Sequence, residues 1–393
     1  MIESKIKVYK KEEIKCRHEW ENYIYTICRI VYWRIIEPDV DWITNDMETF
    51  INRNMENETE KRNLYGRLLI LEPVTEIGDG AFFICTSLIE ITIGELVETI
   101  GNNAFSGCSS LTSINVDDNN SCYMDSNGIL FNKPVTTLIQ CPIGKNLSEY
   151  KIPESVTSIG NSAFYNCSKL TSIEIPDKVT EIGNSAFYNC KSLTSITIPD
   201  SVTIIDDGAF NGCTSLESIT IPNSVETIGN SAFNNCENLT EIKISDKVTS
   251  IGLEAFYNCS SLESITIPDK VTSIGNSAFS GCFSLTSIII PNSVTAINNR
   301  AFYNCSSLTS IEIGNSVKII DNNAFSGCEN LTSITIPYSE EILIGNNAFS
   351  DCSALTEIKI KCPDIKPSDE IQIEYQEKLK EAGIDEGFTN FIW

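Results

Sequence analysis

Histidine and basic residues are scarce in this chain. It has one histidine, His18, among 393 residues, and 28 Lys and Arg against 53 Asp and Glu, which gives a formal net charge of −25. A Ser-His-Asp or Cys-His arrangement can therefore form only through His18, and a zinc site lacks its usual ligands. The negative charge repels phosphate groups, so we expect no nucleic-acid partner. We also expect no metal and no other cofactor.

Long apolar runs are also missing. The first residues are mostly charged, and the most apolar early run, Ile27 to Ile36, is interrupted by Arg29 and Arg34. A signal peptide needs an apolar core, and a membrane-spanning helix needs about 20 apolar residues. The sequence therefore predicts no membrane insertion and favours a cytoplasmic location.

The 16 cysteines follow a regular pattern and form no Cys-x-x-Cys pair. Eleven of them close an Ala-Phe-x-x-Cys unit, and a long run of these is equally spaced, at Cys167, Cys190, Cys213, Cys236, Cys259, Cys282, Cys305 and Cys328. A fixed period of roughly 20 to 50 residues is typical of a solenoid, in which each coil contacts only its neighbours. We predict a ladder of buried free thiols along the array, and residues of the structural repeat are Phe187, Cys190, Phe210, Cys213, Phe233 and Cys236.

One unit, residues 170–192, shows how a coil is built. Ile173 and Ile175 alternate with Ser172 and Glu174, which is the two-residue period of a strand with one buried face. The proline that follows has no N–H to donate and ends the strand. Two apolar residues beyond it return the chain along the opposite wall. We therefore predict one short strand per coil, paired in parallel with the strands of adjacent coils.

Two corners of each coil are predicted to need a left-handed backbone. The residue three positions before each Ala of the Ala-Phe pair is Gly, Asn or Asp, and so is the residue before each repeat cysteine from Cys167 onward. These residue types tolerate a positive φ. The Asn or Asp after the first corner, such as Asn184 or Asp207, is suited to cap a short helical turn.

The extent of the repeat predicts three segments. Residues 1–65 carry no repeat and form either a cap over the first coil or a separate partner domain. Residues 66–362 carry the repeats, with an insertion near 117–150, because the interval from Cys108 to Cys167 is more than twice the regular spacing of the repeat cysteines. Residues 363–393 are predicted to form a capping helix and an aromatic tail, which either folds back on the last coil or stays available to a partner.

The repeated unit Leu-Thr-Ser-Ile-x-Ile-Pro-x-x-Val-Thr-x-Ile-Gly-x-x-Ala-Phe-x-x-Cys resembles the repeat of BspA-like leucine-rich repeat proteins. Residues 126–145 also resemble a hairpin insertion that is common among them. The resemblance implies a curved, right-handed solenoid with a parallel β-sheet on its concave side, short helical or irregular turns elsewhere, and caps at both ends. It also implies a non-enzymatic interaction scaffold, which in many members is surface-bound or secreted and serves adhesion or host interaction.

Ser and Thr predominate among the outward residues of the predicted concave strands. Thr suits an exposed strand, so stability alone can account for part of this row. Some positions depart from it, and we predict that they anchor a protein or glycan partner: Glu174, Glu241, Lys243, Ile289, Glu312, Glu357 and Lys359. Two alternatives stay open. The partner site of an intracellular recognition protein could lie in residues 1–65, or an enzyme site could lie there and use His18.

Overall fold

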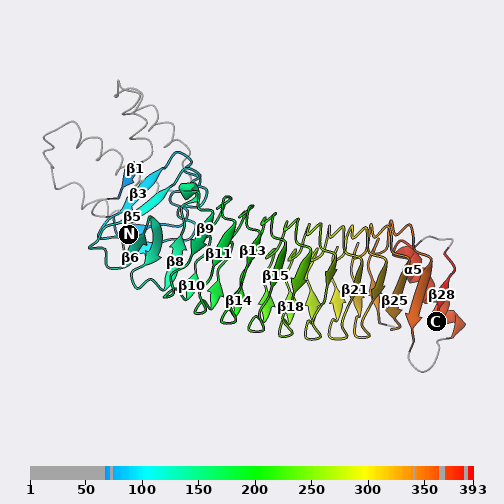
Figure 1. The fold of residues 1–393 in the computed structure, drawn as a ribbon. Helices are drawn as coiled ribbons and strands as arrows, with labels where there is room; N and C mark the ends of the chain where they lie inside the picture. The colour runs from blue at the N-terminus through cyan, green and yellow to red at the C-terminus, as the bar shows by residue number, and fades with distance from the viewer. Residues whose placement is uncertain (1–66, 71–73, 340, 363–367, 385–387) are drawn as a thin grey trace, which may run out of the picture.

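The computed structural model describes residues 67–70, 74–339, 341–362, 368–384 and 388–393. They wind into a parallel β-solenoid of about 12 turns with little helix, so the predicted fold class is confirmed (Figure 1). The predicted N-terminal segment and His18 lie outside the described residues.

One wall of the solenoid is an 11-stranded parallel sheet, in which the later coils contribute one strand each and the C-terminal tail contributes the last strand. Register partners such as Ser172 and Ser195 are equivalent residues of successive repeats. Ile173 is buried beneath the sheet and Glu174 is exposed, as the alternation predicts. In hydrogen-bonded order the strands are β28 (Phe391–Ile392), β27 (Glu357–Lys361), β25 (Ser333–Pro337), β23 (Ser310–Glu312), β21 (Ser287–Ile289), β19 (Ser264–Ile265), β17 (Glu241–Lys243), β15 (Ser218–Thr220), β13 (Ser195–Ile196), β11 (Ser172–Glu174) and β9 (Glu149–Lys151).

A second wall is also a sheet, which corrects the expectation of one strand per coil. The returning stretch of each coil is extended over two residues, and coils in register bring these residues within hydrogen-bonding distance of their equivalents. The resulting 12-stranded sheet contains β26 (Leu343–Ile344), β24 (Ile319–Ile320), β22 (Ala296–Ile297), β20 (Ser273–Ile274), β18 (Ser250–Ile251), β16 (Thr227–Ile228), β14 (Ile204–Ile205), β12 (Glu181–Ile182), β10 (Ser158–Ile159), β8 (Thr137–Gln140), β7 (Ile129–Asn132) and β6 (Tyr123–Ser126).

The first coils form two smaller parallel sheets. The three-stranded sheet contains β1 (Arg67–Leu69), β3 (Glu90–Ile93) and β5 (Ser113–Val116), and the two-stranded sheet contains β2 (Glu76–Ile77) and β4 (Thr99–Ile100). Antiparallel strands β6, β7 and β8 follow them, within the stretch where the sequence predicts an insertion. Asn127 and Gly128 join β6 to β7 with φ of 52° and 73°, the conformation of a tight hairpin turn.

Strand β7 separates two hydrophobic cores. Ile129 and Phe131 pack into the large core of the later coils, whereas Leu130 between them packs into the small core of the first coils. A strand that is buried on both faces has no polar side to offer, which explains the run of three apolar residues.

Stacked phenylalanines run through the large core. From Phe164 to Phe349 each ring lies 5.2–5.6 Å from the next, with planes within 9° of parallel. The repeat thiol of one coil donates a hydrogen bond to the main-chain carbonyl of the Phe in the preceding coil, for example Cys236 Sγ to Phe210 O at 3.3 Å. Each coil therefore repeats the packing of the coil before it.

The repeat thiols are buried and chemically quiet. Burial raises the pKa of Cys213 and of Cys305 to about 12. At pH 8 only about one such thiol in ten thousand is ionised, and the thiolate is the reactive form.

We therefore expect the buried repeat cysteines to resist a thiol-alkylating reagent at pH 8 until denaturant is added. Partly exposed Cys122 should react in the native chain. Peptide mapping by mass spectrometry reads each position separately. Rapid labelling of Cys213 without denaturant would contradict the burial that the structure shows.

The left-handed residue of the first corner is not where the sequence predicts it. Positive φ occurs directly before the Ala, as in Ser185 at 53°, and Gly183 does not have it. A Cβ on Gly183 would lie 2.7 Å from Asn161 Oδ1 and 3.0 Å from Asn161 N, so close approach of the neighbouring coil favours glycine there. Asp206 occupies this position in the next coil, and its Oδ1 accepts a hydrogen bond from Asp207 N at 2.8 Å.

The Asn and Asp side chains after this corner bind the next coil and do not cap a helical turn. Asn161 Oδ1 accepts from Asn184 N at 3.0 Å, and Asp207 Oδ1 accepts from Asn230 N at 2.6 Å. The predicted short helical turn at Ala-Phe is a succession of turns in the described coils. Local bonds between residues three apart alternate with bonds to the adjacent coil along these stretches.

The second corner is left-handed, as predicted. Positive φ values of 55° to 78° occur at Asn166, Asn189, Gly212, Asn235, Asn258, Gly281, Asn304, Gly327 and Asp351. The first coil departs from this pattern, because Ile84 occupies the same corner with a φ of 57°. A β-branched residue is strained in this conformation.

Replacing Ile84 by Asn should therefore raise the free energy of unfolding by about 1 kcal/mol. The side chain is 57% exposed, so little apolar burial is lost. The reciprocal change, Asn258→Ile, should lower stability by a similar amount. Urea denaturation followed by circular dichroism measures both, and equal effects of the same sign would contradict the strain argument.

Helix is confined to short pieces in the described residues. Helix η2 (Ile143–Lys145) is a single 3-10 turn in the insertion, and α5 (Asp369–Glu381) is the longer element near the C-terminus. Tyr375 and Leu379 of α5 are buried against the last coil, and Gly383 follows with a φ of 99°. Strand β28 then adds to the edge of β27.

Candidate partner-binding face

The candidate site is the outer face of the 11-stranded sheet. We define the outer row as the outward first residue of each strand from β9 to β27 together with the residue two positions after it, which in the two-residue strands β13 and β19 directly follows the strand. All seven sequence-predicted partner residues belong to it, together with the hydroxyl residues Ser172, Ser195, Ser218, Ser264, Ser287, Ser310, Ser333, Thr197, Thr220, Thr266 and Thr335. Neighbouring coils place their equivalents roughly 4.8 Å apart, so the row is a regular array.

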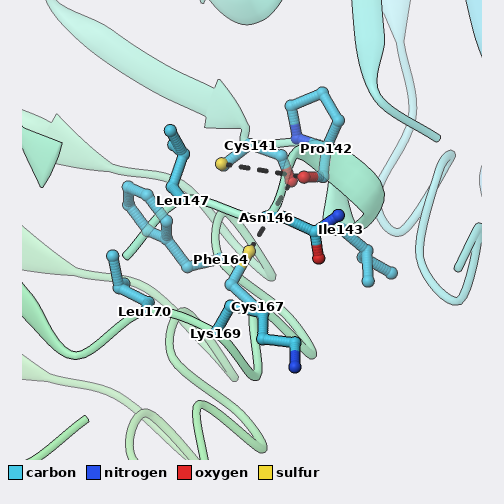
Figure 2. A pocket seen from close by; sticks show the side chains of 9 residues that line it. All are labelled: Cys141, Pro142, Ile143, Asn146, Leu147, Phe164, Cys167, Lys169 and Leu170. Carbon is cyan, nitrogen blue, oxygen red and sulfur yellow. Dashed lines mark hydrogen bonds between the residues drawn. The ribbon is translucent and has the colours of Figure 1, made fainter. Parts of the chain in front are cut away.

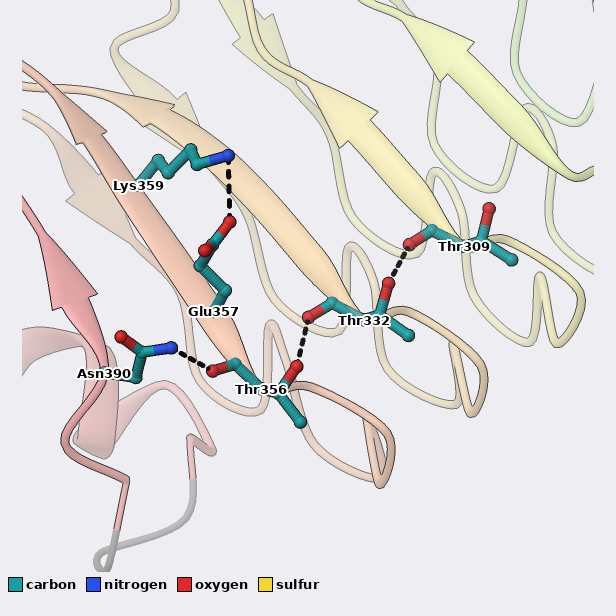
Figure 3. A network of polar contacts seen from close by, with 6 residues as sticks. All are labelled: Thr309, Thr332, Thr356, Glu357, Lys359 and Asn390. Atoms are coloured by element: carbon teal, nitrogen blue, oxygen red, sulfur yellow. Dashed lines mark hydrogen bonds and ion pairs between the residues drawn. The ribbon is translucent and has the colours of Figure 1, made fainter.

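The hydroxyls of the outer row differ from those of the threonines that directly precede most strands of the sheet. In those threonines Oγ1 donates to the carbonyl of the preceding coil, as in Thr332 Oγ1 to Thr309 O at 3.0 Å and Thr356 Oγ1 to Thr332 O at 3.2 Å (Figure 3). The outer-row hydroxyls make no hydrogen bond to another described residue. They therefore keep their donors and acceptors for solvent or a ligand.

Glu174 lies at the N-terminal end of the outer row. Its carboxylate is 2.7 Å from Lys151 Nζ on the neighbouring strand β9, and both side chains are exposed. The hydrogen bond to Glu174 raises the pKa of Lys151. Glu241 and Lys243 lie three coils further on, both exposed on the same face of β17.

The other predicted residues lie together near the C-terminal end. Ile289 is 66% exposed and is the register partner of Glu312. Glu312 Oε1 is 3.8 Å from Lys361 Nζ of β27. On the same strand Lys359 Nζ lies 2.9 Å from Glu357 Oε1 (Figure 3). The fold therefore brings four of the seven residues close together and leaves the others in separate places.

The charges of the outer row nearly cancel. Its acids are Glu149, Glu174, Glu241, Glu312 and Glu357, and its bases are Lys151, Lys243 and Lys359, with Lys361 next along β27, so five negative charges meet four positive ones. The whole chain carries −25. The face is thus close to neutral within an acidic molecule, and it avoids the repulsion that the chain exerts on anionic partners.

Sequence reasoning missed Lys151, Lys361 and Glu149 as members of this face. Lys151 lies one period before Glu174 and is its register partner, so the period alone could have found it. The repeat around it is altered by the insertion, which hides the pattern. Lys361 is the last residue of β27, which is longer than most strands of the sheet. In most other coils the equivalent residue follows the strand and does not belong to the sheet.

Two pockets in the described part of the chain differ widely in size. One, lined by Cys141, Phe164, Cys167 and their neighbours, has a volume of about 10 Å³, the space of one water molecule (Figure 2). Another, of about 270 Å³, lies between the last coil and the segment after α5, against Phe349 and Phe388. Among the described residues no group of three or more His, Cys, Asp or Glu is placed to hold a metal ion.

None of the helices in the described part of the chain is long and apolar enough to span a bilayer.

Repeated coils of this length, with stacked parallel strands and buried ladders of Leu, Ile, Phe and Cys, define a leucine-rich repeat solenoid. A model of the BspA type leucine-rich repeat region matches residues 65–129, 143–263 and 249–368. These matches cover well over half of the chain, which therefore belongs to this family. A search of curated proteins finds no match.

Solved bacterial leucine-rich repeat proteins have similar folds. One from Bacteroides ovatus is 28% identical, with a TM-score of 0.53, over 83% of this chain and 92% of that one. Another from Eubacterium ventriosum is 27% identical, with a TM-score of 0.52, over 71% of this chain and 68% of that one. Leucine-rich repeat families are typical of protein-interaction scaffolds.

Proposed function

We propose that this protein is a non-enzymatic scaffold that binds a protein or glycan partner across the outer row of its 11-stranded sheet. The observation that carries the proposal is the outer row itself, an ordered array of hydroxyls that make no bond within the described protein. Charged residues and Ile289 interrupt the array at a few places. A rigid sheet presents these groups without the entropy cost of ordering them on binding.

Ile289 and its charged neighbours are the strongest candidates for anchors. Ile289 is the most exposed large apolar residue of the sheet, at 66%. Lys361 reaches past the intervening strand to Glu312, so both lie at the same part of the face. Apolar burial and paired charges at one place are the features that concentrate binding energy in an interface. The hydroxyls around them supply polar contacts.

Adhesion or host interaction is the role that we propose for this binding. The support is membership of a family whose repeats build recognition surfaces, together with an extended face that suits a large partner better than a small molecule. The alternatives that place a partner site or an enzyme site in residues 1–65 lie outside the described residues.

Affinity capture tests the proposal directly. Wild-type chain and a variant with Glu241→Ala, Lys243→Ala, Ile289→Ala and Glu312→Ala are immobilised and exposed to surface proteins, cytosolic proteins and a panel of glycans. We expect a ligand that the wild type retains and the variant loses. All four residues are exposed, so the variant should keep its melting temperature. Retention of every captured ligand by the variant would refute the proposal.

A further inference from the structure

The edge of the 11-stranded sheet is closed by the chain's own tail, which is not a repeat. Strand β28 pairs in parallel with β27, with Phe391 opposite Ile358 and Ile392 opposite Lys359. Ile358 N donates a hydrogen bond to Asn390 O at 3.1 Å. A short extended segment thus occupies the place where a further coil would add its strand.

The tail reproduces the bonding of a repeat strand. In successive coils the hydroxyls of Thr332 and Thr356 donate to the carbonyl of the preceding coil, and Asn390 Nδ2 continues the series by donating to Thr356 O at 2.7 Å (Figure 3). Phe391 packs against the core side, while Ile392 is 43% exposed beside Lys359. The backbone pairing, the side-chain hydrogen bond to the preceding strand and the alternation of buried and exposed side chains are therefore those of a repeat strand.

Aromatic side chains hold the tail in place. Trp393 lies 5.7 Å from the ring of Tyr375 and 6.4 Å from that of Tyr338, in edge-on arrangements. Phe388 lies 5.0 Å from Phe391, also edge-on. Phe391 and Trp393 are two residues apart and so share one face of the strand, and the contacts therefore select a segment with aromatic residues at these two positions and at Phe388.

The pairing of the tail is short. Strand β28 has two register pairs with β27, whereas β25 and β27 share five. Among the described residues no further strand adds to β28. Removal of the tail would leave the five-residue edge of β27 and its aromatic contacts open to another segment.

We propose that the β27 edge is a strand-addition site for peptides of the pattern Phe-Thr-Asn-Phe-Ile-Trp, occupied in cis by residues 388–393 and in trans by the tail of a second copy of this chain. Attachment gives the cis tail an effective concentration on the order of millimolar. The intact chain therefore resists exchange, and the site opens to a second copy when its own tail is released.

A labelled peptide of residues 388–393 tests this site by fluorescence anisotropy. It is added to full-length wild type and to a full-length Phe391→Asp, Trp393→Ala variant, whose own tail has lost its anchors. We expect saturable binding to the variant that is at least about tenfold tighter than to wild type, because the cis tail competes in wild type. A peptide carrying Trp393→Ala should bind the variant at least about tenfold more weakly.

Three results would overturn the proposal: equal binding to both chains, no binding to a variant that keeps the circular dichroism of the solenoid, or equal binding of the two peptides. The Asn390→Ala chain is a second, milder variant that keeps the test usable if the double variant does not fold. Asn390 is exposed, and within the described part of the chain its side-chain amide bonds to Thr356 O alone, so its removal should loosen the tail without disturbing the coils. The affinity of the Asn390→Ala chain for the peptide should lie between those of wild type and the double variant. An affinity equal to that of wild type would show that the bond from Asn390 to Thr356 does not hold the tail.

Discussion

Deleting residues 191–213, one complete coil, is expected to leave a folded solenoid, whereas deleting residues 191–201 is expected to abolish native packing beyond the deletion. Register partners are equivalent residues of successive repeats throughout the array. After the full deletion Phe187 meets Phe233 and Cys190 meets Cys236, which are equivalent side chains in equivalent positions. After the half deletion strands meet turns, and buried residues meet exposed ones.

The two deletions differ in whether register survives, so each controls for the other. Each coil contacts only its neighbours, and loss of one coil removes one interface without disturbing the others. We expect the circular dichroism of the full deletion to match wild type per residue, with a cooperative thermal transition. The half deletion should be digested by protease under native conditions. Equal behaviour of the two chains would contradict the solenoid account.

Replacing Phe210 by Ala is expected to lower the free energy of unfolding by about 3–5 kcal/mol, because it leaves a cavity in a close-packed core. Phe210 is fully buried and stacks at 5.3 Å on Phe187 and at 5.4 Å on Phe233, so the change removes two contacts of the stack. Its thiol neighbour Cys236 would also lose well-ordered surroundings. The effect should therefore spread to both adjacent coils.

Ile204 in the same coil offers a matched control. It is an apolar side chain that is 45% exposed on the 12-stranded sheet, and Ile204→Ala should cost about 0.5 kcal/mol or less. Urea denaturation measures the global effect, and native-state hydrogen exchange shows where it falls. A loss below about 1 kcal/mol for Phe210→Ala would show that the stack contributes little.

Much of the fold could be predicted because the sequence repeats its constraints in every coil. The inward Ile173 and outward Glu174 follow from alternation, and the left-handed corner before the repeat cysteine follows from the Asn, Gly and Asp found there. The prediction for the other corner was wrong. Glycine is favoured at position 183 because Asn161 lies close to it, and Gly183 does not have a positive φ. Contacts between coils are invisible to reasoning about one coil.

The candidate face was only partly predictable. Departures from Ser and Thr locate residues such as Ile289, but periodicity does not tell which hydroxyls bond to the preceding coil and which stay unbonded. The ion pair of Glu312 with Lys361 spans two coils and depends on the length of β27. The pairing of the tail with β27 depends on how the chain returns after α5, which no repeat encodes.

The affinity of the captured partner for three purified chains tests the central claim most directly. The chains are wild type, an outer-row variant with Ile289→Ala and Glu312→Ala, and a second-sheet variant with Ile204→Ala and Ser250→Ala. We predict that the outer-row variant binds at least about tenfold more weakly, while the second-sheet variant binds as wild type does. Undiminished binding by the outer-row variant together with weakened binding by the second-sheet variant would place the partner on the other wall of the solenoid and contradict the account.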